Sequence, residues 1–165
     1  MNITQHFQMQ YGAALEMMRT NVAACPDELW NNPQYGNRFW HIAYHSLFYT
    51  AFYLSPSEAQ PVLWSKCKPS YQMMGRWSQA PTYNPNETIP YTKEEINEFI
   101  DFLLERITVA FDETDYDAPS GISWISFNRF GLYMYNLRHL QHHIGQLSER
   151  IRQVTGSGTG WIGKV

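Results

Sequence analysis

Residues 137–152 read LRHLQHHIGQLSERIR and carry the clearest helical pattern in the chain. The apolar side chains in and just beyond this stretch recur at alternating steps of three and four residues, at Leu137, Leu140, Ile144, Leu147, Ile151 and Val154. This spacing predicts a helix with one continuous apolar seam, of the kind that packs nearly parallel or antiparallel to its neighbours. We expect the helix to begin near Ser126 and to end at about Val154, before Thr155-Gly156.

Two earlier segments show the same helical spacing, one at 2–24 and one at 39–54. Pro26 ends the first of them. The second closes at Ser55-Pro56, because a proline disfavours helical geometry at the residue before it.

A further helix is predicted to open at Thr92 and to reach about Phe111. Thr92 and Glu95 have the spacing of a capping box, in which each side chain binds the backbone N–H of the other residue. Four helices in 165 residues predict one all-α domain, 1–165, built as a four-helix bundle.

Residues 55–91 form a long connection that is rich in both proline and aromatic residues. Six of the nine prolines lie here, interleaved with Trp64, Tyr71, Trp77, Tyr83 and Tyr91. Flexible linkers are poor in aromatic residues, and a connection this long in a compact domain is usually functional. We therefore expect an ordered segment, of the kind that covers a site.

Composition and charge exclude several classes of function. Hydrophobic residues make up 44% of the chain and charged residues 16%, so the signature of a disordered protein is absent. A net charge of −3 without basic clusters argues against nucleic-acid binding. No apolar run is long enough to span a membrane, the start has no secretion signal, and Cys25 and Cys67 lack a metal or disulfide spacing. These features predict a cytoplasmic protein with reduced thiols that does not bind membranes.

Five of the six histidines are concentrated in two of the predicted helices. His139 and His143 are one turn apart on the flank of the apolar seam, where both rings can turn toward one point. Neutral imidazole is the commonest protein ligand for metals, and this spacing suits two nitrogens on one ion. On a wheel of residues 39–54, His41 lies nearer the apolar seam than His45 does. We therefore predict a metal site formed by His41, His139 and His143.

Other polar residues near this site have alternative interpretations. His45, Asn136 and His142 are candidates to orient the ligands or to contact a substrate, although His142 lies opposite the seam and is expected to face solvent. The pattern assigns no catalytic residue. A buried histidine with an ordinary hydrogen bond is the competing interpretation for each imidazole.

Two motifs resemble the DinB/YfiT-like superfamily: HLQHHIGQ at 139–146 and WHIAYH at 40–45. The resemblance implies a four-helix bundle of up-down-down-up topology, often a homodimer, with a divalent metal such as zinc or nickel. Its three histidines would be His41, His139 and His143. His45 and the connection at 55–91 depart from the simpler members of the family.

The resemblance also suggests a reaction. Members of that superfamily include transferases and isomerases that use low-molecular-weight thiols. We therefore expect transfer of such a thiol to a small electrophile, in stress or detoxification, because a metal with an open position can bind a thiol as thiolate. The alternatives are a metal-dependent hydrolase, and a bundle that binds a metal or small ligand without catalysis.

Overall fold

The computed structural model describes residues 2–74, 88–112, 114–163 and 165. The described residues form five α-helices and no β-strand, which confirms the all-α prediction. These helices are α1 (Ile3–Ala24), α2 (Asp27–Trp30), α3 (Phe39–Tyr53), α4 (Lys93–Asp112) and α5 (Arg129–Thr155). Among the described residues, no helix combines the length and the apolar character needed to cross a membrane.

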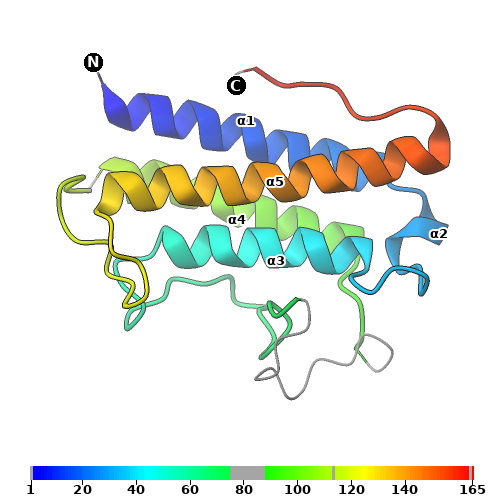
Figure 1. Cartoon of the computed structure of the whole chain (residues 1–165), viewed down its shortest axis with the longest axis horizontal. Helices are drawn as coiled ribbons and strands as arrows, with labels where there is room; N and C mark the ends of the chain where they lie inside the picture. Colours follow the sequence, from blue (N-terminus) through cyan, green and yellow to red (C-terminus); the bar gives the residue numbers. More distant parts are fainter. Residues whose placement is uncertain (1, 75–87, 113, 164) are drawn as a thin grey trace.

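The four long helices lie side by side, and the short α2 leads into α3 (Figure 1). Helices α1 and α3 each pack against both α4 and α5. Followed along the chain, α1 and α5 run in one direction and α3 and α4 in the other (Figure 1). As a result, α3 and α5 are antiparallel neighbours.

The ends of the long helices follow local signals. The Thr92–Glu95 capping box forms as predicted, with Glu95 Oε2 2.8 Å from the Thr92 N and Thr92 Oγ1 3.2 Å from the Glu95 N. Helix α5 starts three residues later than predicted, because Asn128 caps it by accepting from the Gly131 N–H. It ends before Gly156, whose φ of 79° is a left-handed conformation that favours glycine.

Buried polar side chains join the helices across the core. Tyr11 of α1 donates from its hydroxyl to the carbonyl of Tyr133 in α5, at 2.7 Å. Asn21 of α1 donates to the carbonyl of Ile144, at 2.9 Å. Because each of these groups is removed from water, its hydrogen bond offsets the cost of burial and fixes the register of α1 against α5.

The described part of the 55–91 connection is ordered on the face of α3 and α4. Trp64 is buried and stacks on Phe99 of α4, with ring centroids 4.8 Å apart. Tyr91 is fully buried, and its ring stacks on Tyr44 of α3 at 4.7 Å. These aromatic contacts hold the described part of the connection against the helices (Figure 1). Trp77 and Tyr83 lie outside the described residues.

Candidate metal centre

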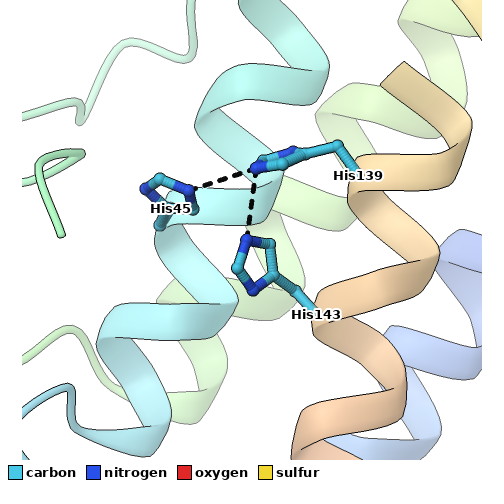
Figure 2. A group of neighbouring side chains, drawn as sticks. All are labelled: His45, His139 and His143. Carbon is cyan, nitrogen blue, oxygen red and sulfur yellow. Dashed lines mark hydrogen bonds between the residues drawn. The ribbon is translucent and has the colours of Figure 1, made fainter. Parts of the chain in front are cut away.

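Three imidazoles converge between α3 and α5 (Figure 2). His45 comes from α3, and His139 and His143 come from successive turns of α5. The Nε2 atom of His139 lies 3.2 Å from Nε2 of His45 and 3.1 Å from Nε2 of His143. The cluster is largely withdrawn from solvent, with His143 buried and the other two rings half-buried.

The outer nitrogens of two rings show which nitrogen faces the centre. His45 Nδ1 lies in hydrogen-bond contact with the backbone carbonyl of Gln72, and His143 Nδ1 lies 2.8 Å from Oε1 of Gln146. A carbonyl oxygen can only accept, so Nδ1 of His45 carries the proton and donates. In the neutral ring the inward Nε2 therefore has a free lone pair. Metal-bound histidines are typically held in this way by a carbonyl on the outer nitrogen.

Two of the three separations match the spacing of ligands on one ion, and all three ligand atoms lie within 4.8 Å of one another. Zinc binds imidazole nitrogen at about 2.0–2.1 Å, which places two nitrogens of a tetrahedral site about 3.3 Å apart. The separations of 3.1 and 3.2 Å are close to that value. Without a shared ion, a proton on His139 Nε2 could be donated to only one of the two neighbouring nitrogens. The lone pairs of the other nitrogen pair would then face and repel each other. The donor set therefore fits a divalent metal.

Burial keeps these imidazoles neutral near pH 7. Desolvation is the largest effect on each of them: it lowers the pKa of His45 to about 3 and that of His139 to about 4, and it also lowers the pKa of His143. The other histidines of the cluster contribute to the low pKa of His45, because like charges repel. Neutral imidazole is the form that binds metals.

The depressed pKa values predict that the metal-free protein loses stability in acid. Unfolded histidine titrates near 6.5, so below that pH the unfolded chain binds protons that the folded protein excludes. The contribution of His45 to the free energy of unfolding is fully present above pH 6.5 and is lost as the pH falls toward about 3. Urea unfolding in chelator at pH 7.5 and pH 4.5 should show a loss that is about 1–2 kcal/mol larger for the natural chain than for His45→Gln. Equal losses in both proteins would contradict the assignment of a buried, neutral His45.

The group that the structure brings together differs in one member from the ligand set predicted from the sequence. His41 is fully buried, but its Nε2 lies 2.8 Å from the carbonyl of Tyr71, and it does not belong to the three-histidine group. His45, one turn further along α3, is level with His139 and takes its place. The helical wheel did not identify His45 because it assumes a single apolar seam. Helix α3 is covered by the other helices and also by residues 55–74, so apolar side chains occupy more than one of its faces.

The remaining candidates have different surroundings. Asn136 is fully buried and donates to the carbonyl of Thr50 at 3.3 Å, so it joins α5 to α3 outside the three-histidine group. His142 is exposed, as its position opposite the seam predicted, and its ring forms a T-shaped pair with that of His143, with centroids 5.1 Å apart.

A cavity of about 660 Å³ opens beside the cluster, and His45 and His139 form part of its wall. The other described lining residues are mainly aromatic or sulfur-containing: Tyr49, Tyr53, Gln72, Met73, Met74, Trp124 and Tyr135. The sequence contains a signal for this arrangement, because His45, Tyr49 and Tyr53 follow at four-residue steps on α3. Such steps put side chains on one helical stripe.

Searches of protein-family models, of curated proteins and of solved structures found no match to this chain. The described residues themselves define the class of protein, which is all-α with a histidine cluster suited to one divalent ion.

Proposed function

We propose that His45, His139 and His143 bind one divalent metal, and that the protein is a metal-dependent enzyme that transfers a low-molecular-weight thiol to a small electrophile. The observation that carries the proposal is the convergence of three Nε2 atoms, one of them oriented by the Gln72 carbonyl. Three protein ligands leave a coordination position open, as in catalytic and not structural metal sites.

The metal, when bound, would supply Lewis acidity that lowers the pKa of a bound thiol. The chain's own contribution is to orient the imidazoles, to exclude water and to hold the electrophile in the adjoining cavity. In the overall reaction the thiol loses its proton to solvent, a new bond forms from sulfur to the electrophilic carbon, and the leaving group departs with the electron pair of the broken bond.

We prefer thiol transfer to hydrolysis because of the residues around the cluster. Among the described residues that line the cavity there is no carboxylate that could act as a general base toward water. The phenols of Tyr49 and Tyr53 are protonated near neutral pH, as tyrosine ordinarily is, and burial raises the pKa of each further. They are therefore suited to donate hydrogen bonds to a substrate or to a leaving group.

The antiparallel arrangement of α3 with α5 and the HLQHHIGQ motif both support membership of the DinB/YfiT-like superfamily, with a four-helix bundle of up-down-down-up topology. In this proposal the second-helix ligand is His45, a departure from the position that the resemblance implies. A cytoplasmic homodimer acting in stress or detoxification belongs to the same proposal.

The experiment loads protein purified without an affinity tag with Zn²⁺ or Ni²⁺, measures the metal content, and then adds monochlorobimane with a panel of small thiols. We expect about one ion per chain and a fluorescent thioether, formed as the sulfur displaces chloride. His139→Ala should abolish both, whereas His6→Ala, an exposed histidine on α1, should change neither.

Two results would contradict the proposal. Absence of metal uptake by the natural chain would overturn the site itself. Metal uptake without enhanced thioether formation for any thiol would overturn thiol transfer, and thermal stabilisation by the thiols in that case would indicate a binding protein. Cleavage of esters without added thiol would indicate a hydrolase.

A further inference from the structure

The cavity beside the histidine cluster has a distinct chemical character. Of its described lining residues, four are tyrosine or tryptophan and two are methionine, and none is an aspartate, glutamate, lysine or arginine. Moving a charged group from water into such surroundings is costly unless a counter-charge receives it. The lining therefore discriminates against charged ligands and favours an apolar one.

Trp124 is the one exposed residue among the described residues that line this cavity. Its side chain is 62% exposed although it is the largest apolar side chain of the lining. The indole stacks flat on Phe52 of α3, with centroids 6.0 Å apart and an interplanar angle of 5°. An exposed indole held in one orientation presents a ready-made face to a planar ligand.

Another part of the lining comes from the 55–91 connection. Met73 and Met74 follow directly after Gln72, whose carbonyl holds His45, so the same stretch of backbone orients the imidazole and lines the cavity. Thioethers are polarisable and flexible, and they make favourable contacts with aromatic rings. The cavity therefore has aromatic and thioether surfaces, and His45 and His139 form part of the same lining.

We propose that this cavity binds an uncharged, planar aromatic molecule, which packs against Trp124 and the methionines with its reactive end directed at His45 and His139. Only the orientation of the ligand's reactive end toward the histidines rests on the proposed function. The selection of an uncharged ring depends on the cavity wall and can be tested without a metal.

The first measurement uses metal-free full-length protein and two probes of similar size, benzyl alcohol and 4-(hydroxymethyl)benzoate. We expect benzyl alcohol to shift the Trp124 indole resonance in NMR spectra and to bind at least about tenfold more tightly than the carboxylate. Trp124→Ala should weaken the binding of benzyl alcohol by about tenfold, the scale of one aromatic pair. Trp161→Ala is the matched control, since Trp161 is 75% exposed and lies outside this lining.

The second measurement repeats the comparison in Co²⁺-loaded protein with benzyl mercaptan and 4-(mercaptomethyl)benzoate. Co²⁺ uptake is recorded first from its visible spectrum, and thiol binding from the sulfur-to-cobalt absorption in the near ultraviolet. We expect the uncharged thiol to be preferred by the same factor, and Trp124→Ala to reduce that preference.

The two measurements separate failure of this inference from failure of the metal site. If Co²⁺ binds but the charged and uncharged probes bind equally in both experiments, the ligand class is wrong and the metal site stands. If Co²⁺ does not bind but benzyl alcohol still depends on Trp124, the metal site is wrong and the ligand class stands. If neither probe shifts the Trp124 signal, the inference is overturned whatever the metal does.

Discussion

Replacing His45 with glutamine is expected to lower the affinity for Zn²⁺ by about a hundredfold or more. Loss of an outer hydrogen-bond partner of a metal ligand already costs about 10- to 100-fold, and His45→Gln removes one of three inward nitrogens altogether. The affinity is measured by competition with a chromophoric chelator at pH 7.5, where burial keeps the remaining imidazoles neutral.

The matched control is the same substitution one helical turn earlier, His41→Gln. The glutamine amide can still donate to the Tyr71 carbonyl, so His41→Gln should leave Zn²⁺ affinity within about threefold of the natural chain. Circular dichroism checks that both variants are folded. The opposite result, in which His41→Gln loses the metal and His45→Gln retains it, would favour the ligand set that the sequence alone predicted and would contradict the site described here.

Truncating Leu140 to alanine should destabilise the protein by about 2–5 kcal/mol. Leu140 is fully buried on α5, between His139 and His143 in sequence, and it faces the core while they face the cluster. The loss has two parts, the transfer free energy of the deleted methyl groups and the cost of the cavity that remains. Urea unfolding of the metal-free protein gives the free energy directly, and an unchanged m-value would show that the denatured state is unaltered.

Met134→Ala supplies the control on the same helix. Met134 is 49% exposed, and its truncation should change the free energy of unfolding by no more than about 0.5 kcal/mol. A similar loss in the two variants would mean that the apolar seam of α5 does not face the core as the structure has it.

Local patterns in the sequence determined the four long helices and two of the three histidines of the cluster. The capping box at Thr92 and the glycine after α5 act within a few residues, so their positions could be predicted without knowledge of the fold. His139 and His143 are neighbours because they lie one turn apart on a single helix, which is a property of helical geometry alone.

Only the tertiary structure decided which histidine of α3 joins them. His41 and His45 are also one turn apart, and the choice between them depends on how far α3 slides along α5, a distance set by packing between elements separated by some ninety residues. The Gln72 carbonyl that orients His45, and the methionines that wall the cavity, likewise come from a connection whose path depends on aromatic contacts with α3 and α4. Helical periodicity indicates which side of a helix is apolar, but it does not determine the axial offset between two packed helices.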